Sequence, residues 1–263
     1  MTHADQNDLA GRRALVCGAS RGIGLACARE LASRGARVTI LSRDPARLDE
    51  ILTTLPGTGH ERVAVDIGDP AALESAVQAA LDQGGVFHIL VNNSGGPASG
   101  PLHLADPKAL APAFLQHVVA AQTLARLILP GMREAGYGRI LNIISTSVKT
   151  PLPGLGVSNT VRGAMANWGK TLATEVAGWG ITVNNILPGA TRTERLASLI
   201  AARAERESRS TSEVETAMRN QIPAGRFAEP EEIGAAVGFL ASPAAAYITG
   251  INLPVDGGRT PSL

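Results

Sequence analysis

The chain contains little of what several classes of protein depend on. It has only two cysteines among 263 residues, Cys17 and Cys27, too few for a disulfide framework or a cluster of metal-binding thiolates. Both lie in a segment that the pattern described below predicts to be one strand, turn and helix, where we expect two small buried thiols. No metal site is predicted.

Net charge and long apolar runs are missing as well. Lysine and arginine together number 24 against 23 acidic residues, which leaves no excess charge for binding nucleic acid or an acidic membrane. No stretch reaches the roughly eighteen apolar residues of a membrane span, and residues 1–8 have neither the basic nor the apolar part of a signal peptide. We therefore expect a cytoplasmic protein with no nucleic-acid or membrane partner.

Aromatic residues make up only 3% of the chain, and Tyr137 and Tyr247 are its only phenols. Tyr137 precedes a predicted strand, which places it at the edge of the sheet opposite to the one that binds ligands in this topology. Tyr247, just before the last predicted strand, is expected to be a packing residue. Neither phenol is expected to serve as a catalytic acid.

Short β-branched or apolar runs alternate with longer helical segments along the chain. Strands are predicted at residues 12–17, 37–42, 62–67, 87–93, 139–145, 181–187 and 251–256. Helical patterns lie between them at about 23–33, 45–55, 70–83, 107–135, 157–179 and 229–241, the spacing expected of crossovers between parallel strands. The pattern predicts one α/β domain over residues 1–263, a doubly wound Rossmann-type seven-stranded parallel sheet with helices on both faces.

One segment, at about 192–222, does not fit this alternation. It is charged, rich in alanine and helical in period, with an interruption at 208–212. It follows the carboxyl end of a predicted parallel strand, where insertions overhang the ligand crevice. We interpret it as a helical lid; a solvated helical excursion without a role in binding is the alternative.

A glycine-rich turn lies between the first strand and the first helix. Gly18, Gly22 and Gly24 permit a tight turn and a close approach of the backbone, whose N–H groups then point at a pyrophosphate. The second strand ends in Ser42-Arg43-Asp44, and an arginine at this place pairs with a ribose 2′-phosphate, whereas a carboxylate accepts from a free 2′-hydroxyl. Arg43, with Arg21 in the turn, predicts NADP(H) over NAD, unless the strand ends one residue later and Asp44 is the ribose ligand.

Further short motifs stand at the ends of later predicted strands: Asp66-Ile67, Asn92-Asn93-Ser94-Gly95, Pro188-Gly189 with Thr191 and Thr193, and Val255-Asp256-Gly257-Gly258. In this order, and with the glycine turn, they resemble the short-chain dehydrogenase/reductase family, and its 3-oxoacyl-carrier-protein reductase-like branch most, over residues 11–259. The resemblance implies a dinucleotide-binding domain, a nicotinamide cofactor and a homotetramer. It implies that cofactor-binding residues are Gly18, Ser20, Arg21, Gly22, Ile23, Gly24, Arg43, Asp66, Ile67, Asn92, Pro188, Gly189, Thr191 and Thr193.

The catalytic positions depart from this family, whose active site consists of Asn, Ser and a Tyr-x-x-x-Lys pair. Aligning the segment 170–184 places Ser158 at the tyrosine position and Arg162 at the lysine position, and only Ser145 is retained. The asparagine position falls on His117.

These substitutions change the proton chemistry that the resemblance implies. A serine hydroxyl is a much weaker acid than a phenol, and an arginine supplies fixed charge but does not shuttle protons near neutral pH. Ser145 and Ser158 are still expected to hydrogen-bond a substrate carbonyl. His117, with an unperturbed pKa near 6.5, is the first candidate for the missing acid and Lys149 the second, although a solvated helix-face histidine and a surface lysine are the alternatives.

The sequence thus predicts an NADP(H)-dependent oxidoreductase that transfers a hydride between nicotinamide and a small carbonyl or alcohol substrate, with an atypical proton donor. Two alternatives stay open: a dinucleotide-binding sensor or noncatalytic oligomer partner, and a lyase or isomerase using the same crevice. Replacement of lysine by arginine keeps the charge at position 162, which favours an active enzyme.

Overall fold

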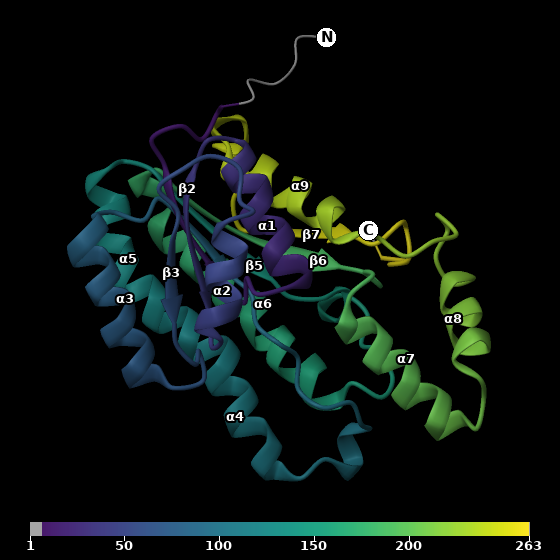
Figure 1. Ribbon diagram of the computed structural model, residues 1–263. Helices are drawn as coiled ribbons and strands as arrows, with labels where there is room; N and C mark the ends of the chain where they lie inside the picture. The colour runs from purple at the N-terminus through teal and green to yellow at the C-terminus, as the bar shows by residue number, and fades with distance from the viewer. Residues whose placement is uncertain (1–6, 263) are drawn as a thin grey trace.

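The computed structural model describes residues 7–262 and forms one seven-stranded parallel sheet in the order β3-β2-β1-β4-β5-β6-β7 (Figure 1). The order reverses between β1 and β4, which creates the crevice in which such sheets bind ligands, at the carboxyl ends of the strands. The predicted fold class is confirmed. The strands are β1 (Arg13–Cys17), β2 (Arg37–Ser42), β3 (Glu61–Ala64), β4 (Ile89–Asn92), β5 (Gly138–Ile143), β6 (Ile181–Pro188) and β7 (Asn252–Val255).

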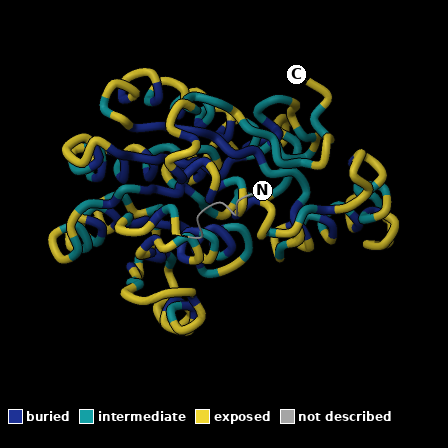
Figure 2. Tube along the Cα trace, turned by 90° about the horizontal axis from the view of Figure 1, so that it is seen from above, coloured by how far each residue is buried: buried dark blue, intermediate teal, exposed yellow. Residues whose placement is uncertain are grey.

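Helices cover both faces of the sheet. One apolar core lies under α1 (Gly22–Ser33), α2 (Pro45–Leu52) and α9 (Pro230–Ala241), and the other under α3 (Pro70–Gly84), α5 (Ala120–Glu134) and α6 (Gly156–Val176). The central strands are buried along almost their whole length (Figure 2), as expected of parallel strands that are covered on both sides. This rigid sheet presents the loops at its carboxyl edge.

The long helix predicted at 107–135 is interrupted. A short 3-10 turn at Pro107–Ala109 leads into α4 (Leu110–Phe114), a π-helical turn follows at Leu115–Val119, and α5 then continues to Glu134. A π-helical turn inserts one extra residue and rotates the side chains beyond it, which is why such turns often occur at functional sites. Apolar periodicity does not reveal a single inserted residue.

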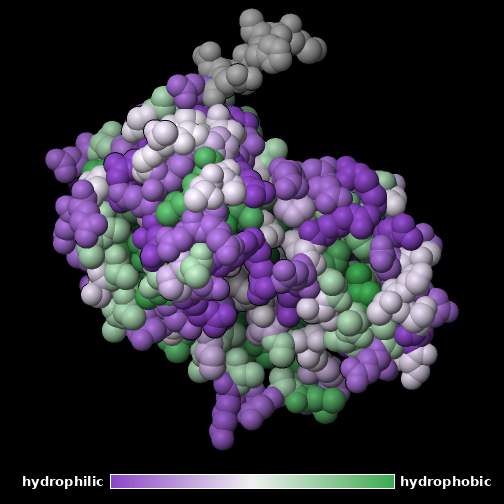
Figure 3. Space-filling model, viewed as in Figure 1, coloured by the Kyte–Doolittle hydropathy of each residue, from purple (hydrophilic) through white to green (hydrophobic). Residues whose placement is uncertain are grey.

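The segment at 192–222 forms two helices, α7 (Glu194–Glu207) and α8 (Thr211–Arg219), that project from the body of the molecule beside the carboxyl edge (Figure 1). Ser208, with a φ of 50°, ends α7 in the left-handed conformation, and Ser210 begins α8 with a reciprocal capping box. The pair has a small apolar cluster of its own, formed by Leu196, Ile200, Ala204, Val214, Ile222 and Phe227. In the space-filling view this lobe is set off from the body by a notch (Figure 3).

The structure shows where the two cysteines and the two tyrosines lie. Cys17 and Cys27 are buried and unpaired, and burial raises the pKa of both thiols to about 12. Tyr137 is buried, and its hydroxyl donates to the Ala241 carbonyl (2.6 Å). Tyr247, two residues after the 3-10 turn Pro243–Ala245, is fully exposed, so the expectation that it packs is wrong. Among the helices of residues 7–262, none is long and apolar enough to cross a bilayer.

Candidate active site

The glycine turn after β1 forms a closely packed cradle. Gly18 and Gly22 have positive φ values of 60° and 53°, which an L-residue with a side chain seldom adopts. A Cβ at Gly18 would lie 2.7 Å from Asn93 Nδ2, and one at Gly24 would collide with the Gly18 carbonyl oxygen. The side-chain amide of Asn93 connects the turn to the end of β4, because it donates hydrogen bonds to the carbonyls of Cys17 and Gly18 (3.2 Å each). No side chain caps the start of α1, so its first backbone N–H groups are left for an anion such as the diphosphate of the predicted cofactor.

The structure distinguishes between Arg43 and Asp44, the two candidates for binding the adenosine ribose of the cofactor. β2 ends at Ser42, as predicted, so Arg43 follows the strand directly. Asp44 is the N-cap of α2, and its carboxylate accepts from the Arg47 backbone N–H (3.1 Å). Arg43 is 78% exposed, and its nearest acidic partner is Asp66, at 3.8 Å. The guanidinium of Arg43 is therefore available at the cleft, whereas the carboxylate of Asp44 is used in a helix cap.

Arg21 lies in the glycine turn, at the start of α1, as predicted. Its guanidinium pairs with Glu194 at the start of α7, so it links the glycine turn to α7. The methyl group of Thr193 lies 3.1 Å from the position that a Cβ of Gly22 would take, which brings the two segments into contact. Two distant predicted cofactor residues, Gly22 and Thr193, are thus neighbours.

The residues after β6 form the other side of the crevice. A Cβ at Gly189 would lie 2.8 Å from Asp256 Cα, so the backbones of the two C-terminal motifs run close together. Thr191 is buried, and the Thr193 hydroxyl caps α7 by accepting from the Leu196 N–H (3.3 Å). These contacts bring the predicted nicotinamide end together with the start of α7.

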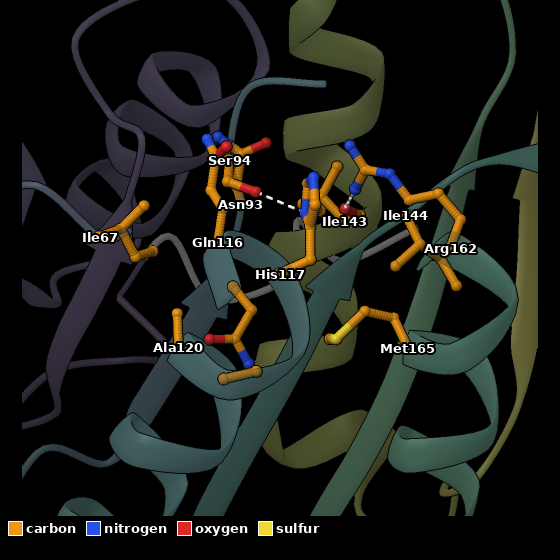
Figure 4. Close-up of a pocket in the computed structure, with 12 residues that line it drawn as sticks. Ile67, Asn93, Ser94, Gln116, His117, Ala120, Ile143, Ile144, Arg162 and Met165 are labelled. Carbon is orange, nitrogen blue, oxygen red and sulfur yellow. Dashed lines mark hydrogen bonds between the residues drawn. The ribbon is translucent and has the colours of Figure 1, made fainter. Parts of the chain in front are cut away.

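The predicted catalytic residues come from the end of β5 and the first turns of α6. Arg162 follows Ser158 by one helical turn, is only 9% exposed, and donates from Nη1 to the Ile143 carbonyl (2.8 Å; Figure 4). Ser158 is half-buried, and no hydrogen bond to its hydroxyl is found within residues 7–262. Ser145 caps the 3-10 turn Thr146–Val148, where its Oγ accepts from the Ser147 N–H (3.1 Å).

His117 lies in the π-helical turn and points into a pocket beside Arg162 (Figure 4). Its Nδ1 is 2.6 Å from the Ser94 hydroxyl, and its Nε2 is buried without a partner in the described structure. Burial, with the charge of Arg162, lowers the pKa of His117 to about 3, against a smaller rise from the Gly95 carbonyl. The ring is therefore neutral near pH 7, and the expectation of a titration near pH 6.5 is not met.

The positive charge around the pocket is not balanced by carboxylates. Burial and the neighbouring Arg195 lower the pKa of Arg162 to about 10, which keeps it protonated near neutral pH. Arg195, from α7, donates to the Pro97 carbonyl (2.5 Å) and so connects α7 to the loop after β4. Within residues 7–262 neither guanidinium has an acidic partner, although Arg21 and Arg192 nearby are both paired.

Several residues that line the pocket were not predicted as site residues from the sequence. Ser94, Gln116 and Met165 line the pocket with His117, and Asn92 reaches it from inside the sheet instead of from the surface of the cleft. The signal for Ser94 was present, because it directly follows the Asn-Asn pair at the end of a predicted strand. No group of three or more His, Cys, Asp or Glu side chains suited to a metal ion occurs in the described part of the chain.

Comparisons with known proteins place this geometry in a large family. The family model described as enoyl-(acyl carrier protein) reductase matches residues 18–260. The 3-oxoacyl-(acyl-carrier-protein) reductase FabG of Vibrio cholerae is 35% identical over 95% of this chain and 98% of its own length. The gluconate 5-dehydrogenase of Gluconobacter oxydans is 33% identical over all of both chains.

Solved structures agree with the sequence comparisons. The L-sorbose reductase of Gluconobacter frateurii, crystallised with NADPH and L-sorbose, superposes with a TM-score of 0.92 at 32% identity, over 99% of this chain and all of its own. The gluconate 5-dehydrogenase of Burkholderia cenocepacia, in complex with NADP and tartrate, has a TM-score of 0.88 at 29% identity, over 98% of this chain and 99% of its own. The chain therefore belongs to the short-chain dehydrogenase/reductase family.

Proposed function

We propose that the protein is an NADP(H)-dependent oxidoreductase that interconverts a carbonyl and an alcohol on a small molecule. The observation that carries this proposal is the glycine cradle, which stands at the same edge of the sheet as Ser145, Ser158 and the buried Arg162. The relatives crystallised with NADPH or NADP support the choice of cofactor, and Arg43 gives the adenosine end a cation for a 2′-phosphate.

The chain's own residues would bind and polarise the substrate. A bound NADPH supplies the hydride. Ser145 and Ser158 donate hydrogen bonds to the carbonyl oxygen, and the fixed charge of Arg162 stabilises the negative charge that develops on it. Neutral His117 accepts a proton at one ring nitrogen and releases one from the other. It therefore passes protons on and does not store one as an imidazolium. Loss of a tuned phenol lowers the rate by about 10² to 10⁴.

The charge of the pocket points to the substrate class within this proposal. Arg162 and Arg195 lie close enough for the charge of Arg195 to lower the pKa of Arg162, and neither has a carboxylate partner within residues 7–262, so an anionic group on the substrate balances them. We expect Arg195→Gln to raise KM for a keto acid about tenfold and to leave KM for an uncharged ketone nearly unchanged. An equal loss for both substrates would contradict this assignment.

Turnover tests the proposed function directly. Oxidation of NADPH with a panel of ketones, keto acids and 3-oxoacyl thioesters should proceed slowly with at least one class. A second candidate, a noncatalytic dinucleotide sensor, is favoured by the missing tyrosine and lysine and predicts tight NADPH binding without turnover. The double variant Ser158→Tyr, Arg162→Lys separates them: a sharp gain in carbonyl reduction indicates a weakened reductase, and no gain with intact NADPH binding favours the sensor.

We also propose that the protein is a cytoplasmic homotetramer. The unpaired cysteines are compatible with a reducing compartment. Apolar side chains are exposed around the segment before α4 and within it, including Leu102, Leu104 and Phe114, where Figure 3 shows hydrophobic atoms at the lower edge. Light scattering at micromolar concentration tests the assembly, and a monomer contradicts it.

A further inference from the structure

Three asparagines stand side by side inside the sheet and end at the pocket. Asn92 of β4 is in register with Asn142 of β5, and Asn142 is in register with Asn185 of β6. The Asn92 amide donates to Asn142 Oδ1, and the Asn142 amide donates to Asn185 Oδ1, at 2.8 Å each. All three are more than nine-tenths buried. We call these three residues the asparagine row.

A backbone carbonyl sets the direction of the row. Asn185 Nδ2 donates to the Ala166 carbonyl of α6 (3.3 Å), and a carbonyl can only accept, so Asn185 Oδ1 must face Asn142. Asn142 therefore turns its amide nitrogen to Asn185 and its oxygen to Asn92. Asn92 in turn must present its own nitrogen to Asn142, which leaves Asn92 Oδ1 at the far end.

Close packing holds the row in place. A Cβ at Gly169 of α6 would lie 2.6 Å from Asn185 Oδ1 and 2.9 Å from Asn142 Nδ2, so the helix lies directly on the two amides. Asn252 of β7 accepts from Asn185 Nδ2 (2.8 Å) beyond the Ala166 contact, and it is exposed. Its removal leaves Asn185 attached to Ala166.

The free end of the row is an acceptor in the catalytic pocket. Asn92 Oδ1 and His117 Nε2 are both buried without a partner in the described structure, and both residues line the same cavity of about 10 Å³, room for about one water molecule. An unsatisfied buried acceptor is costly, so Asn92 Oδ1 requires a donor in this cavity. The nearest unsatisfied ring nitrogen there is that of His117.

We propose that Asn142 and Asn185 are positioning residues: the row presents Asn92 Oδ1 as an acceptor and thereby selects the Nε2–H tautomer of His117, through one water in the cavity. Nδ1 of the ring then accepts from the Ser94 hydroxyl. The Gly95 carbonyl is a competing acceptor for a ring N–H. If Nδ1–H donated to that carbonyl, the ring would be in the Nδ1–H tautomer. With its proton held on Nε2, the neutral ring has only Nδ1 free to accept a hydrogen bond or a proton.

The wild-type protein provides the first test. Nitrogen-15 NMR of protein labelled at histidine distinguishes the two neutral tautomers, and His117→Gln identifies the His117 signals among those of five histidines. We expect the Nε2–H form between pH 6 and pH 8. The Nδ1–H form in the wild type would overturn the proposal, whatever any variant does.

A matched pair of variants provides the second test. Asn142→Leu breaks the row between Ala166 and Asn92, so the His117 signals should shift to a mixture of tautomers. Asn252→Leu removes an asparagine in the same register outside the row and should leave them unchanged. Equal spectra for all three proteins would overturn the proposal, provided that thermal unfolding shows Asn142→Leu to be folded; if it is not, the wild-type spectrum decides.

The kinetic arm of this test rests on the proposed function. In an active enzyme Asn142→Leu should lower kcat by about tenfold or more with little change in KM, and Asn252→Leu should not. Absence of turnover in the wild type would remove the proposed function and leave the tautomer measurement intact. The two proposals therefore fail separately.

Discussion

The two halves of the crevice follow different rules. On the side of β1 and β2, the proposed cofactor site consists of backbone conformation, of glycines with no room for a side chain and of an exposed arginine. On the side of β5 and α6, the proposed chemistry depends on side chains, of which Arg162 is buried and held by a hydrogen bond to the Ile143 carbonyl. The resemblance to the family implies that the first side keeps the family's pattern and that the second carries Ser158 and Arg162 at the tyrosine and lysine positions. A cradle made of backbone tolerates almost no substitution, while a proton path can be rebuilt from different side chains.

The largest effect should come from the chemical side. Arg162→Ala removes the buried charge of the pocket and should lower kcat by about 10² to 10³, because electrostatic stabilisation of the oxyanion is lost. Arg162→Lys keeps the charge and should retain much more activity. Steady-state kinetics with both variants measure this, and equal rates for Ala and Lys would contradict an electrostatic role.

The next effect tests the cradle. Gly24→Ala forces a methyl group against the Gly18 carbonyl and should weaken NADPH binding by about 100-fold, since overpacking typically costs about 1–3 kcal/mol. The control is Gly178→Ala, where a Cβ meets nothing within 4 Å. Isothermal titration compares the two, and unchanged affinity for Gly24→Ala would disprove the cradle.

A smaller effect concerns the choice of cofactor. Arg43→Ala should weaken NADPH binding by about 10-fold to 100-fold and leave NADH binding nearly unchanged, because a charge-assisted hydrogen bond contributes about 1.5–3 kcal/mol. Arg62→Ala, which removes another exposed arginine that pairs with Asp49, serves as the control. An unaltered preference for NADPH after Arg43→Ala would exclude Arg43 as its cause.

The effect that is smallest near neutral pH is the one on pH dependence. The folded protein holds the pKa of His117 at about 3 against 6.5 in the unfolded chain, so only the unfolded state takes up this proton between those values. Stability from this group is complete above pH 6.5 and falls by about 1.4 kcal/mol for each pH unit below it. Denaturation midpoints of wild type and His117→Gln between pH 4 and pH 7 should diverge, and parallel curves would contradict a neutral buried ring.

Much of the fold was predictable because its signals are local. Seven apolar runs separated by crossover lengths specified the parallel strands, and the spacing of Gly18, Gly22 and Gly24 between a strand and a helix specified the turn. The boundary of β2 at Ser42 was also correct. Several strand ends were placed too far out, as at Asp66, because apolar residues continue past the last ladder hydrogen bond.

The catalytic pocket was less predictable because its contacts join distant segments. Ser94 and His117 are 23 residues apart, and His117 meets Ser94 from a π-helical turn that apolar periodicity does not reveal. Arg21 pairs with Glu194, which is 173 residues away along the chain. Neither pairing has a signature in the neighbouring sequence.

By itself the sequence determined which segments become strands and where the glycine turn between β1 and α1 lies, because each depends on residues within a few positions of one another. The tertiary structure decided the charge state of His117, the ion pair of Arg21 and the alignment of the three asparagines. Burial and strand register set these properties, and both arise only when segments far apart in the chain are packed together.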